Sequence, residues 1–121
     1  MSTVEETGMQ IVRFQDAPTF EPKGHEGVLN RALVSTQWHD TPQVSVWWGR
    51  FDRGGKADLH VHEEETQVYV VLSGSFVVAD EQTEHTLEAR DTAVIPAGHR
   101  HRIAVVGDRG EVMVVTTPGL R

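Results

Sequence analysis

Two histidines one residue apart, His60 and His62, begin the stretch HVHEEETQ and lie on a predicted strand. Side chains two residues apart share one face of a strand, so both imidazoles can reach a single ion. Gln67 follows five residues later, past a polar turn, and begins the predicted strand QVYVVL. His101 comes directly after the turn PAGHR and enters another predicted strand. These four residues are the candidate ligands of a metal ion.

The chemistry of these ligands leaves the identity of the metal open. Imidazole binds iron, manganese, nickel, copper and zinc alike, so we expect one divalent transition metal ion from this group. Gln67 offers a neutral amide oxygen, which either binds the ion directly or holds a bound water beside a three-histidine site. Glu65 is a carboxylate substitute for Gln67, but its place in a run of three glutamates favours a solvated acidic loop.

Two further side chains are candidates for carrying protons during catalysis. Tyr69 shares one face of its predicted strand with Gln67, and a buried tyrosine satisfied by the backbone is the alternative interpretation. His99 lies two residues before His101 and could act as a general base or pocket residue, or simply be part of the turn.

The elements that position these residues are short, valine-rich strands. We expect strands at 9–14, 31–36, 43–51, 57–62, 67–72, 75–79, 84–87, 93–95, 102–106 and 111–116. The turn signals DRGG, SGS, ADEQ, PAG and GDRG separate them, and no segment has a long helical period. The pattern predicts an all-β sandwich or barrel.

Composition limits the organisation and the partners of the chain. Its 121 residues fit one domain, which we place at 9–121 after a flexible tail at 1–8, with a turn-rich arm or lid at 15–30. The net charge of -7 argues against binding to nucleic acid or a membrane surface. No long apolar stretch, secretion signal or cysteine is present, so we expect a cytoplasmic protein without disulfides.

The apolar patterning also predicts an oligomer. Strands such as VYVVL and EVMVV are apolar on both faces. One face would line the interior of a barrel, and the other would pack on a second sheet or a partner chain. We therefore expect a homodimer.

The spacing of the candidate ligands resembles a known family. One block reads G-x5-H-x-H-x4-Q-x6-G from Gly54 to Gly74, and a second reads D-x4-P-x-G-x-x-H from Asp91 to His101. These blocks resemble the two motifs of the cupin superfamily, and the resemblance covers about residues 43–116. It implies a jelly-roll β-barrel that binds a metal.

The chain departs from the family pattern at three positions. Gln67 stands where cupins usually have a ligand glutamate, Arg90 replaces the first glycine of the second motif, and Val105 stands where an asparagine is common. The first departure concerns the metal, and the other two concern turns and packing.

The ligand set indicates several functions. Four neutral ligands leave the charge of the ion uncompensated, which favours anionic substrates such as enolates, phenolates or carboxylates. We prefer a metal-dependent dioxygenase acting on an enolisable or aromatic organic anion, because oxygenases are numerous among metal-binding cupins. The alternatives are a non-redox polyketide cyclase, lyase or isomerase that uses the ion as a Lewis acid, and a ligand-binding or sensing module without catalysis. The sequence does not identify the substrate.

Overall fold

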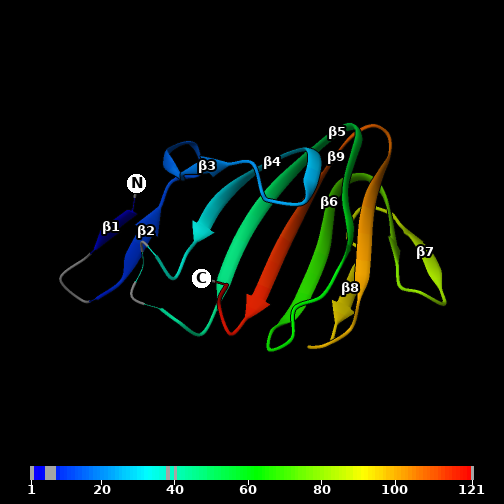
Figure 1. Cartoon of the computed structure of the whole chain (residues 1–121). Helices are drawn as coiled ribbons and strands as arrows, with labels where there is room; N and C mark the ends of the chain where they lie inside the picture. The colour runs from blue at the N-terminus through cyan, green and yellow to red at the C-terminus, as the bar shows by residue number, and fades with distance from the viewer. Residues whose placement is uncertain (1, 5–7, 38, 40, 121) are drawn as a thin grey trace.

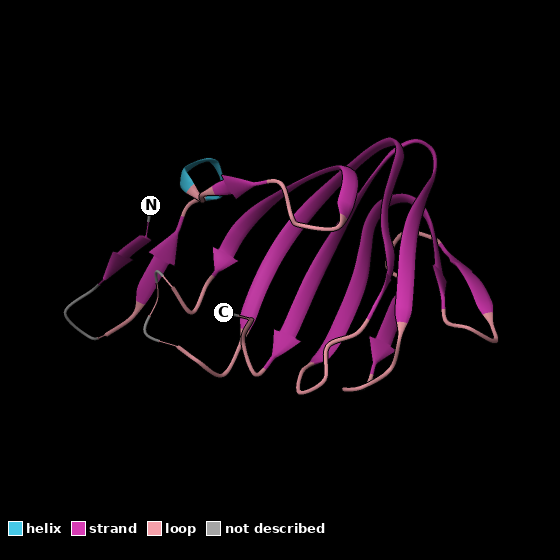
Figure 2. Cartoon of the chain, in the orientation of Figure 1, coloured by secondary structure: helices cyan, strands magenta, loops and turns pink. Residues whose placement is uncertain are grey.

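The computed structural model describes residues 2–4, 8–37, 39 and 41–120 of the chain. Strands dominate these residues, and they contain no α-helix but one short 3-10 helix, η1 (Phe14–Asp16) (Figure 2). In chain order the strands are β1 (Ser2–Val4), β2 (Gln10–Val12), β3 (Thr19–Phe20), β4 (His25–Val34), β5 (Ser45–His60), β6 (Thr66–Ala79), β7 (Glu84–Leu87), β8 (Thr92–Ile95) and β9 (His101–Thr117). No described helix is long and apolar enough to cross a bilayer.

Three long strands form the frame of the molecule. The main sheet runs β3-β4-β5-β9-β6-β7, with β8 paired to β6, and every pairing is antiparallel (Figure 1). Strand β9 lies between β5 and β6 along most of its 17 residues. The all-β jelly-roll fold expected from the sequence is confirmed.

The long strands correct part of the sequence prediction. The ranges 43–51 and 57–62 belong to one continuous strand, β5, and β6 and β9 likewise each join two predicted strands. The signals DRGG, SGS and GDRG mark irregularities within paired strands, where the register between neighbours shifts, instead of turns. A glycine with positive φ allows a strand to bulge and bend while its ladder continues on either side.

Gly74 shows why this bend requires glycine. Its φ is 75°, and a Cβ atom there would lie 2.6 Å from the carbonyl oxygen of Arg109 in the neighbouring strand β9. The close approach of β6 and β9 at this point therefore depends on the absence of a side chain.

The core lies between the inward faces of the sheet. Phe51 of β5 and Phe76 of β6 meet edge to face, with ring centroids 5.1 Å apart, and both are almost fully buried. The inward side chains of β6 alternate along the strand, so Gln67, Tyr69 and Val71 are all buried. The same alternation that builds the core thus carries two candidate site residues into it.

The N-terminal region forms a small separate sheet. Strand β1 pairs with β2 beside the β4 end of the molecule, so part of the segment expected to be a tail is paired (Figure 1). The predicted strand at 9–14 is shorter, because η1 begins at Phe14. Strand β4 begins at His25, six residues before the predicted start at 31, and runs through part of the expected arm.

Candidate metal centre

The structure brings the three candidate histidines together at one end of the β5–β9 ladder. His60 and His101 are directly opposed in the two strands, and their ring centroids lie 4.3 Å apart. His62 stands next to His60, with centroids 5.1 Å apart. One ligand nitrogen of each histidine lies within 4.8 Å of the other two. Among the described residues, this is the group of histidine and acidic side chains whose geometry can hold a metal ion.

His62 reaches this cluster from a loop, because β5 ends at His60 and does not extend to residue 62 as predicted. The amide of Gly98 donates a hydrogen bond of 2.8 Å to the carbonyl oxygen of His62. The turn of the second motif therefore holds the loop of the first motif in place.

Backbone carbonyls orient two of the imidazoles. His60 Nδ1 lies 2.7 Å from the carbonyl oxygen of Asp58, and His101 Nδ1 lies 2.9 Å from that of His99. Only a protonated Nδ1 can donate to a carbonyl, so each Nε2 keeps its lone pair. A hydrogen bond from the other ring nitrogen to a carbonyl oxygen is the usual way in which proteins orient a metal-binding histidine.

Burial favours the metal-binding form of His101 and His62. Burial and, to a lesser extent, the neighbouring histidines together lower the pKa of His101 to about 4, against the opposing effect of the hydrogen bond to the backbone of His99. Burial, followed by the charge of His60, also lowers the pKa of His62. Neutral imidazole at neutral pH is the state that metal binding requires.

Gln67 points its amide oxygen into the cluster. Its side chain is buried, its amide nitrogen donates to Thr116 Oγ1 at 3.4 Å, and its Oε1 lies 3.0 Å from His101 Nε2. With His101 protonated on Nδ1, both of these facing atoms are acceptors. Two ligands at adjacent positions of an octahedral ion with bonds of about 2.1 Å are about 3 Å apart. The pair therefore fits direct ligation of an ion by Gln67.

Tyr69 completes this arrangement. Its hydroxyl donates to Gln67 Oε1 at 3.2 Å and lies 3.1 Å from His101 Nε2, and the side chain is 4% exposed. Burial raises the pKa of Tyr69 well above its usual range, so the hydroxyl holds its proton. The hydroxyl of this tyrosine therefore bonds to a candidate ligand and lies beside a second one, and it does not bond to the backbone of any described residue.

The other two candidates lie elsewhere. The side chain of His99 does not line the same cavity. Its Nε2 pairs with Asp80 Oδ2 at 2.9 Å. The residue lines a second cavity of about 660 Å³ beside β7 and β8. His99 serves the cluster through its carbonyl oxygen, which orients His101. Glu65 is not a member of the ligand cluster, although its charge acts on His62.

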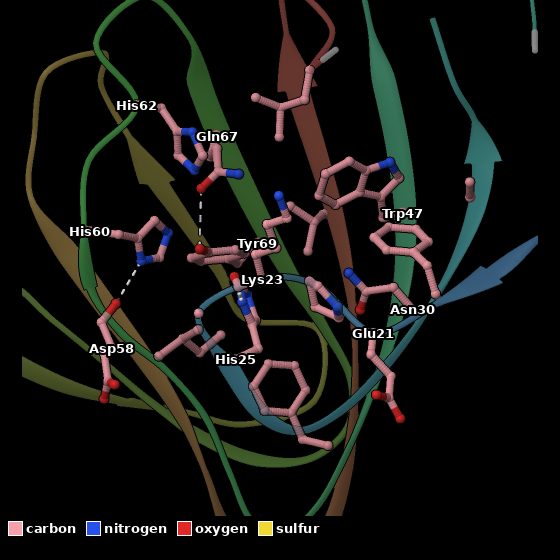
Figure 3. Close-up of a pocket in the computed structure, with 18 of the residues that line it drawn as sticks. Glu21, Lys23, His25, Asn30, Trp47, Asp58, His60, His62, Gln67 and Tyr69 are labelled. Atoms are coloured by element: carbon pink, nitrogen blue, oxygen red, sulfur yellow. Dashed lines mark hydrogen bonds between the residues drawn. The ribbon is translucent and has the colours of Figure 1, made fainter. Parts of the chain in front are cut away.

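The cluster borders a cavity of about 730 Å³ inside the barrel. Figure 3 shows His60, His62, Gln67 and Tyr69 on one side of it, with Trp47 and Asn30 across from them. The segment 20–25, within the expected arm, forms another part of the wall. Such a cavity, with a few polar groups at one end, is of the size and kind that binds small molecules.

His25 is a site residue that the sequence did not reveal. Its ring centroid lies 6.1 Å from that of His60, and its Nδ1 lies 2.8 Å from the carbonyl oxygen of Lys23. Burial lowers its pKa, while the bond to Lys23 opposes the shift. Its place follows from the pairing of β4 with β5, in which His25 opposes Ala57, and no motif signals that pairing.

Comparison with known proteins gives a consistent result. The family model described as Cupin domain matches residues 47–118. A curated relative, the β-D-galactosidase Rv1717 of Mycobacterium tuberculosis (strain ATCC 25618 / H37Rv), is 30% identical over 108 residues, which are 89% of this chain and 92% of that protein.

Two solved structures share the fold. KdgF from Halomonas sp. has a TM-score of 0.76 and 22% identity, with 88% of this chain and 92% of that chain covered. The polyketide cyclase RemF from Streptomyces resistomycificus has a TM-score of 0.77 and 20% identity, with 91% and 80% covered.

Proposed function

We propose that this chain, which belongs to the cupin family, is a metal-dependent enzyme acting on a small oxygen-bearing organic molecule without a change of redox state. The observation that carries the proposal is the three-histidine cluster beside Gln67, with the Tyr69 hydroxyl donating to Gln67 Oε1 and lying 3.1 Å from His101 Nε2. The cluster combines a place for a cation with a proton donor at the edge of a half-open cavity.

Different residues would bind the metal and donate the proton. His60, His62 and His101 would hold the ion through imidazole nitrogen, and Gln67 through Oε1. A divalent ion held by neutral ligands keeps its charge and supplies Lewis acidity toward a carbonyl or hydroxyl oxygen. Tyr69 holds a proton beside the same position, on the wall of the cavity.

The named relatives favour non-redox chemistry. One is called a galactosidase and one a polyketide cyclase, and neither name refers to oxygen chemistry. The dioxygenase acting on an enolisable or aromatic anion is therefore our second candidate, supported by the three-histidine cluster. A small-molecule sensor without catalysis is the third.

Metal content is the first test. Protein purified without an affinity tag or added metal should contain about one equivalent of a divalent transition metal by plasma mass spectrometry. A His60→Ala/His101→Ala double variant should lose it. A His85→Ala/His99→Ala variant is the matched control, because neither of these imidazoles belongs to the ligand cluster, and it should keep the metal.

The identity of the metal and the use of oxygen separate the candidates. Zinc, or turnover that is unchanged in the absence of oxygen, supports the non-redox enzyme. Iron or copper together with oxygen consumption on diketones or enolisable aromatics would move the assignment to the dioxygenase. No metal in the wild type, even after incubation with excess divalent ions, would overturn both metal-dependent functions.

A further inference from the structure

We propose that the half of the cavity opposite the metal ligands binds the ring of a carbohydrate, with Trp47 stacking on the ring and Asn30 binding its hydroxyl groups. This inference rests on the proposed function and names the class of substrate for the same site. Its basis is the placement of these two side chains relative to Tyr69.

Trp47 and Tyr69 stand at two ends of one inward row of side chains. The row crosses the sheet from Trp47 on β5 through Val114 on β9 to Tyr69 on β6. Two inter-strand spacings separate the backbones of Trp47 and Tyr69 by about 10 Å. A monosaccharide lying over Val114 would therefore contact the indole and place an oxygen near the ligand cluster.

Phe20 fixes the orientation of the indole. Its ring meets Trp47 edge to face, with centroids 5.1 Å apart and an angle of 80° between the planes, and both side chains line the cavity. The face of an aromatic ring is electron-rich, so it attracts the positively polarised C–H groups on one side of a sugar ring. A fixed indole beside an open cavity is therefore suited to stacking.

Asn30 supplies a polar group without a protein partner. The residue is 5% exposed, lines the cavity, and its side chain makes no hydrogen bond to any described residue. Figure 3 shows it on the same side of the cavity as Trp47. The polar atoms of this amide are not among the fully buried atoms that lack a partner, so they are open to the cavity, and a ligand that supplies donors and acceptors can replace water there.

The chemistry of an amide selects among ligands. It offers both donors and an acceptor, and a hydroxyl group can satisfy either. A carboxylate could accept from the amide nitrogen but would leave the oxygen unsatisfied. Asn30 therefore favours a ligand rich in hydroxyl groups over an apolar or anionic one.

Gly49 makes room for this amide. Gly49 is the partner of Asn30 in the β4–β5 ladder, and a Cβ atom there would lie 2.9 Å from Asn30 Oδ1. The charged side chains of the cavity lead to the same conclusion, because the described lining residues include two carboxylates, Glu21 and Asp58, against one lysine, Lys23. The wall thus lacks the cationic cluster expected for a strongly anionic substrate.

The test is binding of simple sugars to the protein as purified. Saturation-transfer NMR titrations would use methyl β-D-galactopyranoside and methyl β-D-glucopyranoside, with benzoate as the aromatic anion for comparison. The wild type should bind at least one sugar more tightly than benzoate. Trp47→Leu should weaken that binding roughly 3- to 12-fold, the range expected from the loss of one aromatic stacking contact.

Trp48 provides a matched control. Its side chain points to the opposite face of β5, where its Nε1 donates to Glu111 at 2.8 Å. Trp48→Leu should therefore leave sugar affinity unchanged, and Asn30→Ala and Gly49→Ala should each weaken it. Circular dichroism melting curves would confirm that the variants used are folded.

The outcomes separate this inference from the proposed function when metal content is measured on the same samples. Metal-loaded wild type that binds benzoate but neither sugar would overturn the inference and leave the metal-dependent enzyme standing. Sugar binding that is unchanged in folded Trp47→Leu and Asn30→Ala would also overturn it. If the wild type contains no metal but binds sugar, and the two variants lose this binding, the result would support the sugar-binding surface and overturn the metal-dependent function.

Discussion

Gln67 determines the charge of the candidate metal centre. Thr116 fixes its amide so that Oε1, not Nε2, faces His101 and accepts from Tyr69. A glutamate at the same place would add a negative charge to a cluster that otherwise contains only neutral groups. Its charge would increase the affinity for the metal and decrease the Lewis acidity of the metal toward a substrate oxygen.

Gln67→Glu should therefore bind the metal more tightly and turn over substrate more slowly. Electrostatic attraction to the new carboxylate should lower the dissociation constant by more than about tenfold, as measured by competition with a chelator. Gln37→Glu adds the same charge to the wall of the same cavity, and it should change the metal affinity less. Unchanged affinity in Gln67→Glu would show that residue 67 lies outside the coordination sphere.

Tyr69→Phe should separate proton transfer from metal binding. The variant keeps the ring and loses only the hydroxyl, which donates to Gln67 Oε1 and lies close to His101 Nε2. We expect the metal content to stay near that of the wild type and kcat to fall by about 100-fold or more. The free energy of unfolding should fall by about 1 kcal/mol, since one buried hydroxyl is removed. A variant that keeps full kcat would exclude Tyr69 as the proton carrier.

At the scale of the elements, strand alternation explains which site residues could be predicted from the sequence. Gln67 and Tyr69 are two apart on β6, and His101 begins β9, so their common inward direction follows from the pleat. His99 lies in the turn before β9, where alternation does not apply, and its side chain points to Asp80 instead.

The cavity residues that could not be predicted owe their positions to the pairing of strands that are distant in sequence. Asn30 and His25 join the cavity only because β4 pairs with β5, and no motif marks the residues before 43. Glycine also gives an ambiguous signal, because a bulge in a continuous strand and a turn between two strands both require positive φ. For this reason the barrel was predictable, but its long bent strands were not.

Two glycines provide a test of this bend. Gly54 and Gly74 have φ of 77° and 75°, but a Cβ atom meets nothing within 4 Å at Gly54 and lies 2.6 Å from Arg109 O at Gly74. Gly54→Ala should cost about 1–2 kcal/mol through backbone strain alone. Gly74→Ala should cost about 1–3 kcal/mol more, because β6 and β9 must also move apart. Urea unfolding of both variants measures the difference, and equal losses would show that the contact with β9 relaxes freely.

At the scale of the whole molecule, the outward face of the sheet is apolar as well. Val46, Val115, Val68 and Val94 lie side by side in one row across β5, β9, β6 and β8. Val94 is 64% exposed, and the next row contains Trp48, Met113 and Val70. Contiguous apolar surface of this kind is uncommon on monomers. A two-fold axis on this face would bury the row of one copy against that of another.

The homodimer therefore stays a prediction, now with a specific interface. Light scattering after size exclusion should give the mass of two 13.5 kDa chains for the wild type. Val94→Asp should give the mass of one chain, because a carboxylate buried in an apolar contact without a partner is strongly unfavourable. Val106→Asp places the same charge at another exposed valine, near the bend of β9, and should remain dimeric. A wild type that is monomeric at high concentration would refute the dimer, and a dimeric Val94→Asp would place the interface elsewhere.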